Sequence, residues 1–339
     1  MAADYREHPP AGPPGDEASA DEFDLVDAAV EGDDSIATRA AQVSDDDHGQ
    51  RLDKWLVALA PEFSRSHLQG LVERGHVRVA TGAQVRVELT PSRKLVAGQR
   101  VELQLVPTAE SRAFRAEPLP LDVVFEDEHV LVLHKPAGLV VHPAAGHWSG
   151  TLLNGLLAHH AAAASLPRAG IVHRLDKDTS GLMVVGKTLE AVTALVRAIA
   201  AREVGRVYLA IAHGSWRDAR DTIDAPIGRD PASRVRMAVV RDGKPARTDV
   251  ERVALRDGFS ALRCTLHTGR THQIRVHLAW RGHPLVADAL YGGARALGLQ
   301  RQALHAVRLA LAHPLDGRPL QFEAPAPPDF AAAWQQVAG

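Results

Sequence analysis

Residues 171–188 contain the side chains best suited to covalent chemistry. The stretch IVHRLDKDTSGLMVVGKT places two carboxylates, Asp176 and Asp178, in a charged loop that leads into the apolar run 182–185. An ionised carboxylate can act as a nucleophile, and a loop fixed on a rigid scaffold is a common place for one. Residues 179–181 favour a tight turn that would fix the loop. Taken alone, the stretch also fits an ordinary charged turn.

The end of the same stretch fits a second pattern, because residues 181–188 read G-x4-G-K-T. A phosphate-binding loop of this type follows a buried strand and turns its backbone N–H groups toward phosphate. Here residues 182–185 are apolar and favour burial as a strand, whereas the preceding residues 173–180 are polar. A P-loop nucleotidase is therefore a disfavoured alternative, which ATP binding to the wild type and to Lys187→Ala would test.

A second polar cluster lies in LHTGRTHQIRVHLAW, residues 266–280. Read as a strand, this segment places Gln273, Arg275 and His277 on one face. The pair Arg270 and Arg275 is suited to binding phosphate or carboxylate. The three histidines of the segment are spaced five residues apart and have no cysteine or carboxylate cluster beside them, so no metal site is predicted.

A small module is predicted at residues 48–107, made of two short helices and a hairpin. Ser64 is a candidate N-cap for the second helix, and strands are expected at residues 76–80 and 100–106. Basic side chains occupy its expected exposed positions, among them Arg65, Arg74, Arg78, Arg93 and Lys94.

A larger α+β domain is predicted at residues 108–339. Apolar runs alternate with helical patterns such as residues 189–202, which is typical of a mixed sheet with helices packed on it. The runs expected as strands are residues 130–133, 182–185, 208–212 and 262–266.

The charge of the chain is unevenly distributed. Residues 1–47 hold 14 Asp and Glu against two Arg, a net charge of −12, and they are predicted to be a disordered acidic tail. The remaining residues hold 27 acidic and 37 basic side chains, a net charge of +10. A basic body suits a polyanionic partner, although a biased but merely solvated surface fits equally well.

Several classes of protein are disfavoured by composition. The one cysteine, Cys264, excludes an internal disulfide. We find no secretory signal and no apolar run of the roughly 18 residues that a membrane span requires. The sequence therefore predicts a cytoplasmic protein that does not bind a membrane.

Several motifs together resemble the RluA-type pseudouridine synthases. The stretch RAGIVHRLDKDTSGLMVVGKT resembles the signature of this family. Further matches follow in the order of the family, and the module before them resembles the S4 RNA-binding domain. The matching stretches include HKPAGLVVHPAAGHWSGTLLNGLL, GRVYLAIAHG, GKPARTDV, LHTGRTHQIRVHLAWRGHPLVADALYGG and RQALHAVRLALAHP.

The resemblance implies an enzyme that isomerises uridine to pseudouridine, with a flipped-out base and no cofactor, metal or nucleotide. Asp176 would be the nucleophile, Arg275 its charge partner, and Tyr208 the side chain that stacks on the base. Asp176 would attack the ribose C1′ or the base, or abstract a ribose proton, and the sequence does not choose among these routes.

The resemblance also implies residues that bind the RNA. Those expected around the substrate are His173, Arg174, Thr179, Arg270, His272 and Gln273. Those expected in the S4-like module are Arg65, Ser66, Arg74 and Arg78.

The expected partner is 23S ribosomal RNA, or the pre-ribosomal large subunit, bound by a monomer. The stem-loop that faces the decoding centre (helix 69) is the implied target. Other ribosomal or transfer RNA uridines remain alternatives, as does a non-catalytic RNA-binding or ribosome assembly factor with the same fold.

Overall fold

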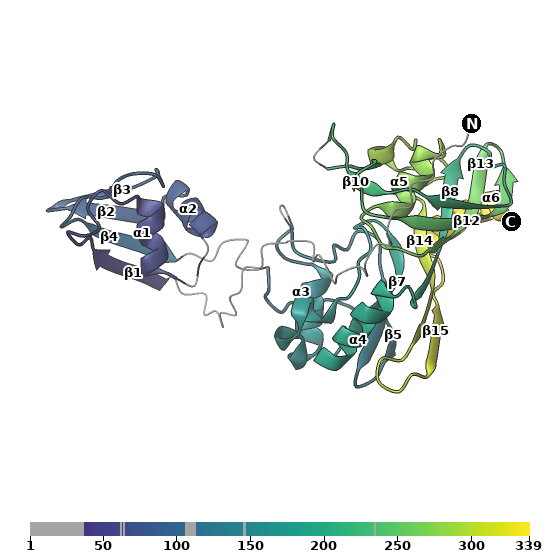
Figure 1. Cartoon of the computed structure of the whole chain (residues 1–339), viewed down its shortest axis with the longest axis horizontal. Coiled ribbons are helices and arrows are strands. Elements are labelled where there is room, and N and C mark those ends of the chain that lie inside the picture. Colours follow the sequence, from purple (N-terminus) through teal and green to yellow (C-terminus); the bar gives the residue numbers. More distant parts are fainter. Residues whose placement is uncertain (1–36, 62, 64, 106–112, 145–146, 234) are drawn as a thin grey trace, which may run out of the picture. The chain divides into compact units, whose positions relative to one another are not determined.

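The computed structural model describes residues 37–61, 63, 65–105, 113–144, 147–233 and 235–339. The chain divides into two compact units, Met1–Pro107 and Thr108–Gly339 (Figure 1). Each unit has a hydrophobic core of its own. The predicted acidic tail lies outside the described residues up to residue 36, as do the expected N-cap Ser64 and the last residue of the second predicted strand, Val106.

The small unit is a four-stranded antiparallel sheet with two helices, and its strand order is β1-β4-β2-β3. Leu52 and Leu56 of the first helix and Leu68 and Leu71 of the second are buried in one core with the sheet, as their helical spacing predicts. Its elements are β1 (Ala37–Gln42), α1 (Leu52–Leu59), α2 (Arg65–Glu73), β2 (Val77–Thr81), β3 (Gln84–Val87) and β4 (Arg100–Leu105).

The prediction of a disordered tail is wrong for residues 37–47. Strand β1 pairs with β4, and Val43, which follows it, is buried in the core of the small unit. The carboxylate of Asp47 accepts hydrogen bonds from the Ser44 hydroxyl at 2.7 Å and from the Trp55 indole N–H at 3.1 Å. The composition of this segment did not indicate a strand because a short edge strand is held by backbone hydrogen bonds and needs few large apolar residues.

The large unit is built on a nine-stranded mixed sheet of order β5-β6-β7-β14-β8-β13-β12-β9, with β15 paired to β14. Strands β7 and β14 are parallel, and the other described neighbours in this sheet are antiparallel. The predicted mixed, mainly antiparallel sheet with flanking helices is confirmed. The strands are β5 (Val123–Glu126), β6 (Val130–Lys135), β7 (Ser180–Gly186), β8 (Gly205–His213), β9 (Arg220–Asp224), β12 (Arg247–Arg256), β13 (Phe259–Leu266), β14 (Leu304–Ala312) and β15 (Pro319–Glu323).

The remaining elements lie around this sheet (Figure 1). A separate pair of short strands is formed by β10 (Ile227–Arg229) and β11 (Met237–Val239). The α-helices are α3 (Leu152–His159), α4 (Leu189–Ala200), α5 (Gln273–Trp280) and α6 (Pro328–Ala338), and the 3-10 helices are η2 (Ala161–Ser165), η3 (Pro167–Gly170) and η4 (Ala289–Tyr291).

Strand β7 is covered on both faces. Leu182 and Val184 pack in one cluster with Leu195 of α4, whereas Met183 and Val185 pack in another cluster. This double coverage explains the continuous apolar run, because a strand buried on both faces has no polar side.

The phosphate-binding loop interpretation of residues 181–188 is wrong. Residues 181–186 belong to the buried strand β7, so their backbone N–H groups do not form an open loop. Lys187 pairs with Glu126 at 2.8 Å, and the Thr188 side chain caps α4 by accepting the backbone N–H of Ala191 at 3.2 Å.

Candidate active site

The loop that carries Asp176 connects η3 to β7 and is held from several sides. The backbone N–H of Thr179 closes a turn by donating to the carbonyl of Asp176 at 3.0 Å. The backbone N–H of Gly138 donates to the carbonyl of Lys177 at 2.9 Å, and Arg301 donates to the carbonyl of Asp178 at 3.0 Å. The loop therefore holds its carboxylate on a fixed support.

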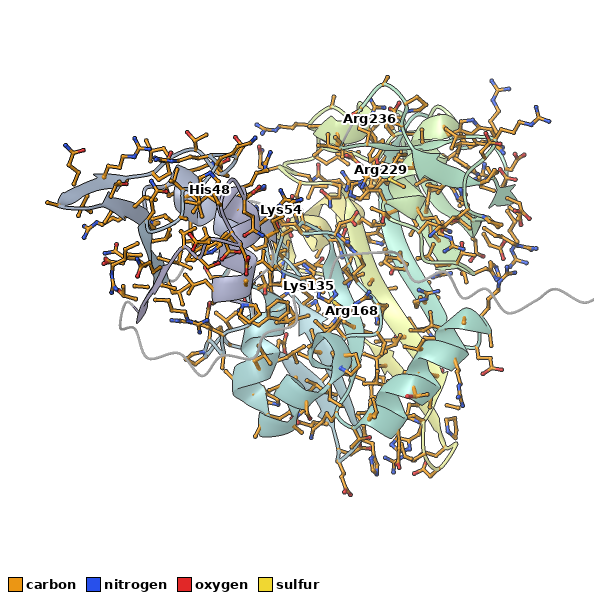
Figure 2. All side chains as sticks on the ribbon, turned by 60° about the vertical axis from the view of Figure 1, so that its left-hand side comes forward. His48, Lys54, Lys135, Arg168, Arg229 and Arg236 are labelled. Atoms are coloured by element: carbon orange, nitrogen blue, oxygen red, sulfur yellow. The ribbon has the colours of Figure 1, made fainter. Side chains whose placement is uncertain are left out.

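Lys135, at the end of β6, fixes the same loop from inside the large unit (Figure 2). Its side chain is fully buried, and the ammonium group donates to the carbonyls of Pro136 at 2.7 Å, Leu139 at 2.9 Å and Lys177 at 2.9 Å. Burial lowers the pKa of Lys135, against the attraction of the Asp178 and Asp176 charges. The three carbonyls match the three N–H donors of an ammonium group, so Lys135 ties two loops together.

Arg275 joins two carboxylates. One Nη1–H donates to Asp176 Oδ2 at 2.9 Å, while Nε and Nη2 form a two-pronged pair with Asp288 at 2.8 and 2.9 Å. Arg275 and Asp288 are buried, and Asp176 is 14% exposed. Burial alone would lower the pKa of Arg275, but the hydrogen bonds with Asp288 and the charge of Asp176 raise it above its usual range. A permanently charged guanidinium thus orients the Asp176 carboxylate.

The strand reading of the segment that contains Arg275 is wrong. Residues 273–280 form helix α5, which follows a loop after β13, and six of its eight residues are buried. His272 precedes the helix in a left-handed conformation with φ 57°. In the helix, Arg275 faces Asp176 and Asp288, whereas His277 is buried elsewhere and contacts Thr248 at 2.9 Å and the carbonyl of Ala225 at 3.0 Å.

His272 and Tyr291 form a hydrogen-bonded pair beside the carboxylate. Tyr291 Oη accepts the backbone N–H of Met237 at 3.0 Å and lies 2.8 Å from His272 Nδ1. If the hydroxyl donates to Nδ1, the other ring nitrogen, Nε2, carries the proton and faces Asp176 Oδ1 at 3.8 Å. Burial lowers the pKa of His272 despite the charge of Asp176. Arg275 also stacks on the Tyr291 ring, 5.0 Å from its centre.

Asp288 and Tyr291 were not singled out as site residues from the sequence. Both belong to the stretch ADALYGG, which contributes to the family resemblance without a local pattern that indicates chemistry. The usable signal was the unusual clustering of an acid and a tyrosine with two glycines in a chain that has three tyrosines.

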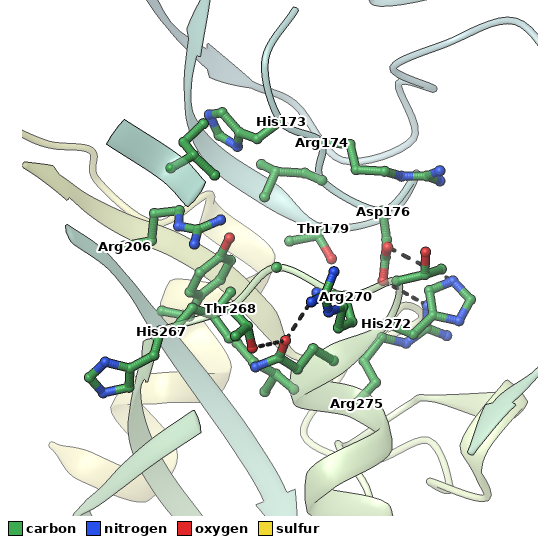
Figure 3. A pocket seen from close by; sticks show the side chains of 18 of the residues that line it. His173, Arg174, Asp176, Thr179, Arg206, His267, Thr268, Arg270, His272 and Arg275 are labelled. Carbon is green, nitrogen blue, oxygen red and sulfur yellow. Dashed lines mark hydrogen bonds and ion pairs between the residues drawn. The ribbon is translucent and has the colours of Figure 1, made fainter. Parts of the chain in front are cut away.

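A pocket of about 330 Å³ opens in front of Asp176 (Figure 3). Tyr208, on β8, lines it and is 5% exposed. Burial, assisted by the charge of Asp176, raises the pKa of Tyr208 to about 12 against the effect of Arg206, so the hydroxyl stays neutral at physiological pH. The pocket therefore brings a carboxylate from the loop before β7 and a neutral aromatic side chain from β8 to one cavity, within the size range of small-ligand sites.

Two of the expected substrate-binding residues have polar atoms engaged within the protein. The Gln273 side chain accepts from Thr268 at 2.7 Å and from the backbone N–H of Arg270 at 3.0 Å, and its amide donates at 2.9 Å to Arg247 and Thr248. Gln273 therefore fixes the loop before α5 while it also lines the pocket, and its contact with a substrate stays a prediction. His173 Nε2 accepts the backbone N–H of Val184 at 3.0 Å.

All six expected substrate-binding residues line the pocket. Arg174 is exposed, whereas Arg270 is half-buried and donates to the carbonyl of Pro245 at 3.1 Å. Thr179 is buried and accepts from Gln302 at 3.3 Å. In the described part of the chain, no group of three or more His, Cys, Asp or Glu residues is placed to hold a metal ion, and no helix is long and apolar enough to cross a membrane.

The expected RNA-binding residues of the small unit differ in their surroundings. Arg65 pairs at 2.8 Å with Asp53, a fully buried carboxylate whose pKa is held well below its usual range by hydrogen bonds, chiefly from Arg51. Arg65 thus has a structural role in addition to any contact with RNA. Arg78 lies 3.8 Å from Glu102, and Ser66 and Arg74 are exposed on and just after α2.

Comparison with known proteins adds independent observations. Residues 129–280 match the RNA pseudouridylate synthase family. The chain is 46% identical over 303 residues to ribosomal large subunit pseudouridine synthase D of Nitrosomonas europaea, covering 87% of this chain and 86% of that protein. It is 48% identical over 296 residues to the protein of that name from Neisseria meningitidis serogroup B, covering 83% and 77%. The solved structure of human RNA pseudouridylate synthase domain containing 1 is similar with a TM-score of 0.51 at 29% identity, covering 64% of this chain and 90% of that one.

Proposed function

Because the chain belongs to the RNA pseudouridylate synthase family, we propose that it isomerises specific uridines of large-subunit ribosomal RNA, with Asp176 as the nucleophile. The observation that carries the proposal is the contact between Asp176 and Arg275 at 2.9 Å on the wall of a pocket that Tyr208 also lines. A carboxylate positioned by a buried guanidinium is ready to react, and a neutral aromatic ring beside it can stack on a base.

The chemistry needs no partner besides the RNA. The C1′–N1 bond of uridine breaks, the uracil turns and a C1′–C5 bond forms. The proton on C5 leaves to solvent, and N1 gains a proton. The product has the same atoms as the substrate apart from exchangeable protons, so the reaction requires neither an oxidant nor an energy source. Asp176 begins it by attack on C1′ or on the base, or by abstraction of a ribose proton. Arg275 balances the negative charge of the carboxylate, and Tyr208 supports the detached base.

The charge of the pocket suits a nucleotide that is flipped out of RNA. Its lining holds one acidic side chain, that of Asp176, together with five arginines. An excess of guanidinium groups attracts the phosphates on both sides of a flipped base. The arginines are Arg174, Arg202, Arg206, Arg270 and Arg275.

The proposed target is the 23S stem-loop that faces the decoding centre (helix 69). Both relatives described above bear names that assign them to the large ribosomal subunit. The resemblance noted in the sequence supports the stem-loop, and other ribosomal or transfer RNA uridines are the alternative outcomes.

Tritium release tests the activity itself. RNA labelled with [5-³H]uridine loses its label to solvent when C5 bonds to C1′, so the wild type is expected to release tritium from large-subunit RNA. Binding of this RNA without release of tritium would contradict the proposal and favour a non-catalytic RNA-binding factor.

We expect Lys135→Met to lower the rate of tritium release by roughly 10²-fold, because small displacements of a reacting group have effects of this size. The substitution leaves three carbonyl groups without their donor, one of them that of Lys177, next to Asp176. Single-turnover rates and urea unfolding measure the effect. Lys187→Met is the matched control, since Lys187 donates to Asp127 and pairs with Glu126. A Lys135→Met rate equal to that of this control would show that the buried ammonium does not position the loop.

We also propose that the small unit supplies affinity for RNA through contacts with phosphates. Arg74→Ala is expected to weaken binding and to reduce the slope of log affinity against log salt by about 1, with little effect on the single-turnover rate at saturation. Arg86→Ala, in the same unit, is the control, because Arg86 already lies 3.6 Å from Glu88. Equal changes in slope for both variants would indicate a general effect of charge and contradict a specific contact by Arg74.

A further inference from the structure

Arg206 is a buried cation on the wall of the pocket. It lies on β8 two residues before Tyr208, so both side chains project from the same face of the strand, and both line the pocket. Arg206 is 5% exposed. The reaction steps proposed above give this guanidinium no contact of its own with the base, beyond its share in the positive charge of the pocket.

No residue in the described part of the chain accepts a hydrogen bond from the guanidinium. Its Nε atom is buried and has no hydrogen-bond partner among the described residues, and no described acidic side chain forms an ion pair with it. Arginine stays protonated in proteins, so this charge cannot be removed by loss of a proton. Burying a donor of this kind without a partner is costly, which indicates that its partner arrives with the substrate.

The surroundings leave room for the guanidinium but add no negative charge. A Cβ atom at Gly269 would lie 2.8 Å from Arg206 Nη1, so glycine at that position allows Arg206 its place. Burial, together with the charge of Arg206, lowers the pKa of His173 to about 3, so this neighbour is neutral. Asp176 and Arg206 lie on opposite sides of the pocket in Figure 3.

We propose that Arg206 is a specificity-determining residue that donates hydrogen bonds to the O4 carbonyl oxygen of the flipped uracil. This inference rests on the proposed function and deepens it. Arg174 and Arg202 are exposed and Arg270 is half-buried at the pocket, where they can reach phosphates. Arg206, in contrast, is buried on the strand that also carries Tyr208, where a base enters. A guanidinium only donates hydrogen bonds. It can therefore donate to the O4 carbonyl of uracil but finds no acceptor in the amino group that cytosine has at that position.

The experiment compares two stem-loop RNAs that differ in one base, with uridine or cytidine at the target position. The wild type is expected to bind the uridine form at least about tenfold more tightly. Arg206→Met should lose most of this preference and release tritium more slowly, while its salt slope stays that of the wild type. Because the substitution removes an unpaired buried charge, the unfolding temperature of the free protein should not fall.

Three further variants make the outcome decisive. Gly269→Ala keeps the charge of Arg206 but displaces its guanidinium, so it should lose the same preference. Arg202→Met should show the opposite signature, with a salt slope lower by about 1 and an intact preference for uridine. Arg263→Met removes an exposed guanidinium that pairs with Glu251 on the neighbouring strand, and it should behave as the wild type does.

Two results would overturn the inference. If Arg206→Met keeps the preference for uridine and lowers the salt slope, the guanidinium binds phosphate. If it changes neither affinity nor rate, the guanidinium binds no part of the substrate. The proposed function is tested separately, because wild-type tritium release reports the reaction and the comparison of binding affinities reports Arg206.

Discussion

Asp176→Asn is expected to reduce single-turnover pseudouridine formation by roughly 10⁴-fold or more, the scale seen when an enzyme loses its nucleophile. Asparagine keeps the shape of the side chain, and its carbonyl oxygen can still accept the hydrogen bond that Arg275 donates at 2.9 Å. The loop should therefore stay in place and RNA affinity should change little. The amide has no negative charge and is a far weaker nucleophile and base than a carboxylate, so the first step is lost whether Asp176 attacks carbon or abstracts a proton.

Asp178→Asn is the matched control for this prediction. It lies in the same loop, and its backbone carbonyl accepts a hydrogen bond from Arg301 at 3.0 Å. We expect it to retain most of the wild-type rate in the tritium-release assay. An inactive Asp178→Asn beside an active Asp176→Asn would show that Asp178, and not Asp176, is the nucleophile.

Arg275→Met is expected to lower both the stability of the protein and the reaction rate. It removes the guanidinium between Asp176 and Asp288 and leaves the buried Asp288 carboxylate without the two hydrogen bonds at 2.8 and 2.9 Å. Breaking a buried pair from one side typically costs about 3–5 kcal/mol, which urea unfolding measures directly. The rate should fall as well, because the orientation of Asp176 is lost.

Arg275→Lys separates the two effects. A lysine retains the positive charge, but a single ammonium cannot span two carboxylates with the fixed fork of a guanidinium. We expect intermediate stability and a rate closer to that of Arg275→Met. Wild-type stability in Arg275→Met would show that Asp288 finds another partner and that the three-residue arrangement does not support the site.

The strands near the site were predictable because buried strands consist mainly of apolar residues. Residues 182–185 and 208–212 are apolar runs, and the structure places them in β7 and β8. The resemblance to a known family led to Asp176, Tyr208 and Arg275, which the structure brings to one pocket. Spacing alone did not connect them, since 99 positions separate Asp176 from Arg275.

Helix α5 could not be recognised from periodicity. Residues 273–278 are all buried, so the segment has no polar face from which a helical period could be read. The alternation of Gln273, Arg275 and His277 is also typical of a strand, but contacts with residues distant in sequence stabilise a helix. Arg275 needs Asp288 and Asp176, whereas His277 needs Ala225 and Thr248.

The buried polar groups were the least predictable part of the site. Lys135 and Arg206 are basic residues in otherwise apolar strands, and a basic residue at a strand end is usually exposed. Their roles follow from their surroundings, which are three carbonyl groups for Lys135 and a missing acceptor for Arg206. Such surroundings exist only after distant segments have come together.

The most direct test of the central claim is a map of pseudouridine in 23S RNA by carbodiimide modification and primer extension. The RNA would come from a strain that lacks this protein and would be incubated with the wild type or with Asp176→Asn. We expect new stops in the stem-loop facing the decoding centre with the wild type and none with Asp176→Asn. Stops at other uridines would show that the protein is a pseudouridine synthase with a different target. The same stops with Asp176→Asn, or none with the wild type on intact RNA, would contradict the account.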